Sequence, residues 1–221
     1  MSLSPKDASR RTREICGLAP IIPVLVIEDA TTARPLAEAL VAGGLPALEV
    51  TLRTPAALDA IRAMREVTGG HVGAGTLITP EDVRAAKSAG ATFGVSPGAT
   101  DDLLAACAAE GLPLLPGAAT ASEAMRLLAG GYDMLKFFPA EASGGAAALK
   151  FIGAPLPQIA FCPTGGIDLE NAPGYLALPN VLCAGGSWVA PKALVSRQDW
   201  AGIEALAREA AELGAAQRPV E

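Results

Sequence analysis

The chain has 221 residues, of which 51% are hydrophobic and 18% charged, and its formal net charge is −6. This length and composition suit one domain over residues 1–221 with a sizeable core. The acidic balance, with no basic run beyond residues 10–13, argues against a nucleic-acid partner. No apolar run reaches the roughly 18 residues of a membrane span and the start lacks a secretory signal, so we expect a cytoplasmic protein without membrane contact.

Short apolar runs alternate with helical patterns along the chain. Ser4 and Pro5 predict the start of a short N-terminal helix, because serine caps helices and proline suits the first helical turn. Candidate strands then recur at intervals of about 20 to 26 residues, the length of a βα unit with short loops. The eight predicted strands cover residues 21–27, 47–52, 71–76, 92–97, 112–117, 134–139, 159–165 and 181–186.

The segments between these strands carry helix start and stop signals. Threonine precedes three of the helical patterns, and its hydroxyl is a common N-cap. The predicted N-caps are Thr54, Thr79 and Thr100. Gly90 and Gly111 follow two of these patterns and are expected to end the helices in the left-handed conformation.

Eight strands, each followed by a helix, predict an α/β fold whose parallel sheet closes as a (β/α)8 TIM barrel, with the N-terminal helix as an extra element. A last amphipathic helix is expected over residues 197–214. The alternative is an open, doubly wound sheet. Residues 73–78, GAGTLI, lack the third glycine of a dinucleotide-binding fingerprint, which argues against NAD.

Lys136 lies in the apolar run Met-Leu-Lys-Phe-Phe. Side chains alternate along a strand, so Lys136 faces the barrel interior if Leu135 and Phe137 face the helices. Lysine is almost never fully buried unless it is paired. Three interpretations therefore stay open: a catalytic amine, a structural ion pair with Glu49, or a side chain that reaches out between helices.

Three more polar side chains are predicted to converge near Lys136 at the ends of their strands. Glu49 and Arg53 share one parity of their strand, and this parity points into the barrel. Thr76 lies at the upper end of the next strand, with the parity of Val72 and Ala74. The alternatives are that Glu49 and Arg53 only pair with each other and that Thr76 is a strand-end or cap residue.

Two glycine pairs follow the last two predicted strands, in CPTGGI and CAGGS. In barrels these loops often bind phosphate, because glycine lets backbone N–H groups approach an anion closely. The candidate phosphate residues are Gly165, Gly166, Gly186 and Ser187. A glycine pair by itself is more often a simple turn.

The chain gives little sign of a metal centre or of disulfides. The four cysteines are far apart and lie in apolar or helical segments, so we expect reduced, buried thiols. They are Cys16, Cys107, Cys162 and Cys183. His71 is the single histidine and has no nearby carboxylate or cysteine cluster, so no metal site is expected.

The motifs LEVTLRT, GAGT, SPG, KFFPAE, FCPTGGI and GGSW, taken together between Pro23 and Pro191, resemble the 2-dehydro-3-deoxy-6-phosphogluconate (KDPG) aldolase family. The resemblance implies a (β/α)8 barrel, usually a homotrimer, that acts without a metal or cofactor. It implies a class I aldolase whose phosphorylated keto-acid substrate is cleaved to pyruvate and D-glyceraldehyde 3-phosphate.

The resemblance also implies a role for each candidate residue. Lys136 is similar to the Schiff-base lysine and Glu49 to the general acid/base. Burial among apolar side chains is expected to disfavour the ammonium form of the lysine. The residues similar to the pyruvyl pocket are Arg53 and Thr76 at the carboxylate, Thr164 beside it, and Pro97 and Phe138 as walls. Gly165, Gly166, Gly186 and Ser187 are similar to the phosphate site.

Other functions stay open at this point. The aldolase for the galactonate epimer shares the same lysine and glutamate chemistry. Cleavage of 4-hydroxy-2-oxoglutarate to pyruvate and glyoxylate is a plausible second activity, because the pyruvyl half is the same. A non-catalytic phosphosugar-binding barrel would explain the glycine loops but not Lys136. A metal-dependent aldolase would need a ligand cluster that the sequence does not offer.

Overall fold

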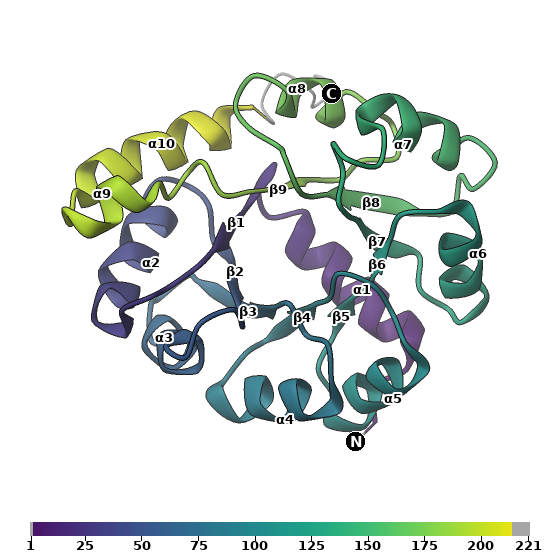
Figure 1. Ribbon diagram of the computed structural model, residues 1–221, viewed down its shortest axis with the longest axis horizontal. Helices are drawn as coiled ribbons and strands as arrows, with labels where there is room; N and C mark the ends of the chain where they lie inside the picture. Colours follow the sequence, from purple (N-terminus) through teal and green to yellow (C-terminus); the bar gives the residue numbers. More distant parts are fainter. Residues whose placement is uncertain (1, 214–221) are drawn as a thin grey trace.

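The computed structural model describes residues 2–213. Short parallel strands curl around the middle of the molecule and helices surround them (Figure 1). The strands are β1 Ile21–Leu25, β2 Ala47–Thr51, β3 His71–Gly75, β4 Phe93–Val95, β5 Leu114–Leu115, β6 Gly117–Ala118, β7 Met134–Phe137, β8 Ala160–Pro163 and β9 Ala184–Gly186. This arrangement confirms the predicted α/β class.

The strands form two hydrogen-bonded sheets. One has the order β5-β4-β3-β2-β1-β9 and the other the order β6-β7-β8. Isolated parallel bridges between Thr164 and Gly185 and between Phe161 and Val181 link the end of the second sheet to the β9 side of the first. The curl brings residues that are far apart in the sequence to the same interior space.

The fifth predicted strand, 112–117, is divided at Pro116. β5 pairs with β4, and β6 pairs with β7. Proline has no N–H to give to a ladder, so the strand changes partners where it stands. The Pro116 carbonyl still accepts a hydrogen bond from the Lys136 backbone N–H at 2.9 Å.

The helices lie around the curled sheets, except for α1, which runs across the middle of the view (Figure 1). They are α1 Pro5–Cys16, α2 Ala33–Ala42, α3 Ala57–Met64, α4 Pro80–Ala89, α5 Asp101–Glu110, α6 Ala121–Ala129, α7 Gly145–Gly153, α8 Ala172–Leu176, α9 Lys192–Ser196 and α10 Trp200–Glu212, with a 3-10 turn η1 at Ala30–Thr32. The last predicted helix therefore starts three residues later than expected, and Gly214 lies outside the described residues. No helix in residues 2–213 has the length and apolarity needed to cross a membrane.

The buried apolar side chains form two separate clusters. The larger one lies between strands and helices and includes Leu48, Val50, Leu135 and Phe137, as their parity predicted. The smaller one lies inside the curled sheets and contains Cys16, Ile22, Ala47, Phe93, Val95, Leu115, Met134, Cys162 and Cys183. The four cysteines are free thiols and all are buried, as predicted.

The parity assigned to the third strand is wrong. Val72 and Ala74 belong to the outer cluster, so Gly73 and Gly75 occupy the inward positions. Thr76 has a φ of 61°, which breaks the strand alternation at this residue. Because the backbone turns there, the Thr76 side chain does not have to point outward as those of Val72 and Ala74 do.

Helix α1 packs against β5 and β7 and contributes Cys16 to the inner cluster. The Ser9 hydroxyl, itself buried, accepts hydrogen bonds from the backbone N–H groups of Asp133 at 2.8 Å and Met134 at 3.2 Å. Arg13 donates to the Asp133 carbonyl at 3.0 Å. These contacts hold α1 at the beginning of β7.

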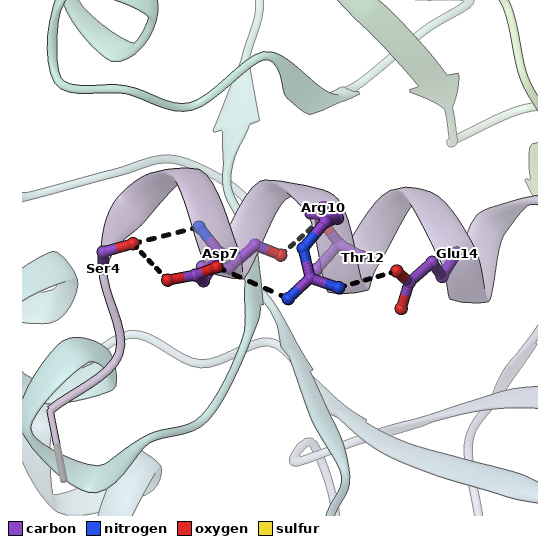
Figure 2. A network of polar contacts seen from close by, with 6 residues as sticks. Ser4, Asp7, Arg10, Thr12 and Glu14 are labelled. Carbon is purple, nitrogen blue, oxygen red and sulfur yellow. Dashed lines mark hydrogen bonds and ion pairs between the residues drawn. The ribbon is translucent and has the colours of Figure 1, made fainter.

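The exposed face of α1 carries a different network, shown in Figure 2. The Ser4 hydroxyl caps the helix by accepting from the Asp7 N–H at 3.1 Å, as Ser4 and Pro5 predicted. Arg10 lies between Asp7 and Glu14 and bonds to both carboxylates. The Asp7 carboxylate accepts hydrogen bonds from the Ser4 hydroxyl and from Arg10. These bonds, that from Ser4 first, lower the pKa of the Asp7 carboxyl.

Two of the three predicted threonine caps are confirmed. Thr79 caps α4 in a reciprocal capping box with Asp82, and Thr100 caps α5. Gly90 and Gly111 end these helices in the left-handed conformation.

The cap predicted at Thr54 is wrong. α3 begins at Ala57, and the Thr54 hydroxyl donates to the Ile27 carbonyl instead. That bond ties the end of the β2 strand region to the end of β1, so tertiary contact overrides the local cap signal.

Candidate active site

Lys136 and Glu49 meet inside the curled sheets. Lys136 comes from β7 and Glu49 from β2, and their residues are 4% and 3% exposed. The Lys136 Nζ lies 3.1 Å from Glu49 Oε1 and 3.5 Å from Oε2. The prediction that both side chains turn inward is thus correct, and the carboxylate is within direct proton-transfer distance of the amine.

Glycine in β3 makes room for the Glu49 carboxylate. A Cβ placed on Gly75 would overlap Glu49 Oε1 and would lie 2.7 Å from its Cγ. β2 and β3 are paired so that Thr51 lies opposite Gly75 and Glu49 opposite Gly73. The GAGT motif therefore has a steric role beside Glu49.

Arg53 and Thr76 form a second polar pair just beyond the ends of β2 and β3. The Arg53 Nε donates to the Thr76 hydroxyl at 3.3 Å. Thr76 has a φ of 61°, and a β-branched residue with positive φ stores strain of about 1–3 kcal/mol. Arg53 is exposed and forms no ion pair with any described carboxylate, so the alternative of a Glu49–Arg53 pair is wrong.

Phe138 covers the amine. Its ring centroid lies 5.3 Å from the Lys136 Nζ, in cation–π range. Gly165 packs on the same ring, since a Cβ there would lie 3.3 Å from it. Thr164 is buried, with its hydroxyl 3.9 Å from the Cys162 sulfur. Pro97 is exposed after β4, and its carbonyl packs tightly on Gly117.

The Gly165–Gly166 turn is fixed through its carbonyl groups. The carbonyls of Thr164 and Gly165 accept from the backbone N–H groups of Ala140 at 2.8 Å and Glu141 at 3.1 Å. The Gly166 carbonyl accepts from the Asn171 side-chain amide at 2.8 Å. Both glycines have positive φ, at 102° and 80°. Within residues 2–213 the Gly166 N–H has no protein acceptor, so it is free to bind an anion.

Gly186 and Ser187 lie beside this turn, because Thr164 and Gly185 are bridged. Ser187 is exposed and lines a cavity of about 480 Å³. The cavity extends from the end of β1 to α9, and its lining includes Val24, Glu28, Thr32 and Lys192. Glu28 and Lys192 form an exposed ion pair with an N–O distance of 2.9 Å. Lys136 and Glu49 do not line this cavity.

The arrangement combines a buried amine, an adjacent carboxylate, an arginine–threonine pair and a glycine turn with a free N–H. It suits imine chemistry on a carbonyl compound that carries a carboxylate at one end and a phosphate at the other. Within residues 2–213 no three His, Cys, Asp or Glu side chains are placed to hold a metal ion.

Several residues around the site were not identified from the sequence. Glu141, Asn171 and Tyr175 surround the glycine turn, and Glu28 and Lys192 border the cavity. The side chains of Asp168 and Asn171 each accept a hydrogen bond from the other's backbone N–H. Asp and Asn three residues apart are typical of a turn, so the sequence does contain a local signal for this one. The bond between Tyr175 and Glu141 spans 34 residues and leaves no local pattern.

Known proteins resemble this chain over most of its length. The family model for KDPG and KHG aldolase matches residues 12–206. A 2-dehydro-3-deoxy-phosphogluconate aldolase from Pseudomonas aeruginosa is 51% identical over 214 residues, which cover 96% of this chain and 97% of that protein.

Solved structures agree. The 2-keto-3-deoxy-6-phosphogluconate aldolase of Zymomonas mobilis, crystallised with 3-phosphoglycerate, has a TM-score of 0.89 and 51% identity, covering 93% of this chain and 97% of that one. The KDPG aldolase of Legionella pneumophila, with pyruvate captured as a covalent carbinolamine, has a TM-score of 0.87 and 46% identity, covering 90% and 97%. These matches confirm the resemblance found in the motifs: the chain is a lyase and belongs to the KDPG and KHG aldolase family.

Proposed function

We propose that the chain is a class I aldolase that cleaves 2-dehydro-3-deoxy-6-phosphogluconate to pyruvate and D-glyceraldehyde 3-phosphate. The observation that carries this proposal is the buried Lys136–Glu49 contact of 3.1 Å, because an amine must lose its proton before it can attack a carbonyl. The family match and the pyruvate carbinolamine of the Legionella enzyme support the same chemistry.

In this mechanism the Lys136 amine adds to the C2 ketone of the substrate, and loss of water gives a protonated imine. The imine accepts the electrons of the C3–C4 bond as that bond breaks. Glu49, acting through a water molecule, takes the proton of the C4 hydroxyl and later returns a proton to the enamine carbon. Hydrolysis of the pyruvate imine then frees Lys136.

The remaining candidate residues hold the two ends of the substrate. Arg53 and Thr76 bind the pyruvyl carboxylate by charge-assisted and hydroxyl hydrogen bonds, with Thr164 beside it. Pro97 and Phe138 wall the pyruvyl pocket. The turn at Gly165 and Gly166 binds the phosphate together with Gly186 and Ser187, a role that the free Gly166 N–H supports.

We also propose that the strands close as a complete (β/α)8 barrel with α1 as an additional element, in one domain over residues 1–221. The bridge between Thr164 and Gly185 supports this closure. A cytoplasmic location and a homotrimer follow from the family resemblance.

The separation of the pyruvyl pocket from the phosphate loops favours a second substrate that has no phosphate. The residues assigned to the pyruvyl half are separate from the glycine loops, so 4-hydroxy-2-oxoglutarate should also be cleaved, without help from the phosphate loops. The galactonate-epimer aldolase is the less favoured alternative, since the curated relative and both structures described above are gluconate enzymes.

Reductive trapping tests the mechanism. Borohydride treatment with pyruvate should add a reduced pyruvate imine to the peptide that contains Lys136, identified by mass spectrometry. Lys136→Ala should give no adduct and no turnover, while Lys150→Ala, at an exposed lysine, should behave like the wild type. A folded wild-type protein without an adduct would favour the phosphosugar-binding barrel.

A further inference from the structure

Tyr175, which is buried, and Glu141, which is exposed, form a partly buried hydrogen bond that the proposed reaction does not use. Tyr175 lies on α8 and is 1% exposed. Its hydroxyl donates to Glu141 Oε1. A buried tyrosine hydroxyl needs a partner, and here that partner is a carboxylate beside the glycine turn.

Glu141 backs the Gly165–Gly166 turn through both its main chain and its side chain. Its N–H donates to the Gly165 carbonyl at 3.1 Å. Its Cβ and Cγ pack under Gly166, where a Cβ would lie 2.8 and 2.7 Å from them. Glu141 therefore contacts two of the four residues assigned to the phosphate, Gly165 through its main chain and Gly166 through its side chain.

The charge of Glu141 makes its orientation matter. A carboxylate that turned toward the glycine amides would repel a phosphate dianion and would compete for their N–H groups. The Tyr175 hydroxyl holds the carboxylate by a charge-assisted hydrogen bond. Burial, followed by the bond to Glu141, raises the pKa of Tyr175, so this hydroxyl stays protonated and remains a donor at neutral pH.

We propose that Glu141 and Tyr175 are positioning residues that set the affinity of the Gly165–Gly166 turn for the phosphate end of the substrate. Tyr175 holds the carboxylate of Glu141. Glu141 then keeps the Gly165–Gly166 loop in the conformation that presents the Gly166 N–H. The inference rests on the proposed function, which assigns this turn to phosphate.

The test is Tyr175→Phe, which removes the hydroxyl and keeps the buried ring. Its KM for KDPG should rise about tenfold, the equivalent of about 1.4 kcal/mol of lost binding. The kcat and KM for 4-hydroxy-2-oxoglutarate, which has no phosphate, should stay within about twofold of the wild type. Tyr132→Phe is the matched control, since Tyr132 is the only other tyrosine and is also buried. It should change neither substrate's KM.

Glu141 variants separate charge from hydrogen bonding. Glu141→Gln keeps an oxygen acceptor for Tyr175, so its KM for KDPG should stay near the wild-type value. Glu141→Ala removes the Cγ that packs under Gly166 and should therefore also raise the KM for KDPG. Equal losses for both substrates in Tyr175→Phe, or an unchanged KM for KDPG, would overturn the inference.

Calorimetric titration with inorganic phosphate separates this inference from the proposed function, because it needs no turnover. Tyr175→Phe should bind phosphate about tenfold more weakly than the wild type. Equal phosphate affinity would refute the positioning role. A wild type that binds phosphate but cleaves no KDPG would refute the proposed function alone.

Discussion

At the scale of single residues, the Lys136–Glu49 pair is costly to the fold. Removing two charges from water costs several kcal/mol per ion, and their attraction seldom repays the whole penalty. Both side chains are almost fully enclosed, at 6% and 4% exposure. Such a pair is hard to explain as a stabilising element, and this strengthens its assignment to chemistry.

This cost makes a stability prediction. Lys136→Met alone leaves the Glu49 charge buried without its partner and should lower the free energy of unfolding by about 3–5 kcal/mol. The double variant Lys136→Met, Glu49→Leu should recover this loss and match or exceed the wild type by about 1–4 kcal/mol, with no aldolase activity. Denaturant unfolding measures both, and a double variant no more stable than the single one would contradict the argument.

Substitution of Gly75 should impair proton exchange about as much as substitution of Glu49, whose carboxylate Gly75 accommodates. Gly75→Ala places a methyl group where Glu49 Oε1 lies, so the carboxylate must move away from Lys136. We expect proton exchange at the pyruvate methyl group, followed by NMR, to fall by about 10²-fold or more, the contribution typical of a positioned acid/base. Borohydride trapping of the imine should suffer less.

The matched control is Gly98→Ala, where an added Cβ meets no atom within 4 Å. It should leave both proton exchange and trapping at wild-type levels. Loss of both in Gly75→Ala, with the control normal, would point to collapse of the interior rather than to displacement of Glu49.

At the scale of elements, α1 is attached to the beginning of β7 through Ser9 and Arg13. Ser9→Ala would leave the partly buried N–H of Asp133 and the buried N–H of Met134 without their acceptor. The expected loss is about 1–3 kcal/mol in the free energy of unfolding, measured with denaturant. Arg10→Ala removes two exposed ion pairs on the same helix and should cost less than about 1 kcal/mol. Equal effects would contradict the role of Ser9.

Elements whose signals are local were predictable from the sequence. The caps at Ser4, Thr79 and Thr100 depend on neighbours within three residues, and the structure confirms them. Thr54 shows the same local signal but bonds to Ile27, 27 residues away. The division of the fifth strand likewise depends on which neighbours flank Pro116, and a single run of sequence does not contain that information.

The candidate site shows the same division between local and distant causes. Inward parity placed Lys136 and Glu49 correctly, because β2 and β7 are regular strands. It failed for the strand of Thr76, where one residue with positive φ ends the alternation. The support given by Glu141 and Tyr175 arises only when α8 folds back on the loop after β7.

At the scale of the whole molecule, the proposed homotrimer predicts a mass in solution of three times the 22.3 kDa of one chain. Light scattering on the purified protein, over a range of concentrations, measures it. A single-chain mass at all concentrations would remove the trimer while leaving the aldolase proposal untouched.

The four buried thiols allow spontaneous local opening of the fold to be measured. An alkylating reagent reaches such a sulfur only during a transient opening, so the labelling rate measures how often each region opens. Cys16, Cys162 and Cys183 report on the interior, whereas Cys107 reports on the layer under α5. Burial raises the pKa of Cys107 to about 12, so its labelling must be compared with an unfolded reference. Faster labelling of Cys107 than of the three inner cysteines would mean that the region of α5 opens more often than the inner cluster.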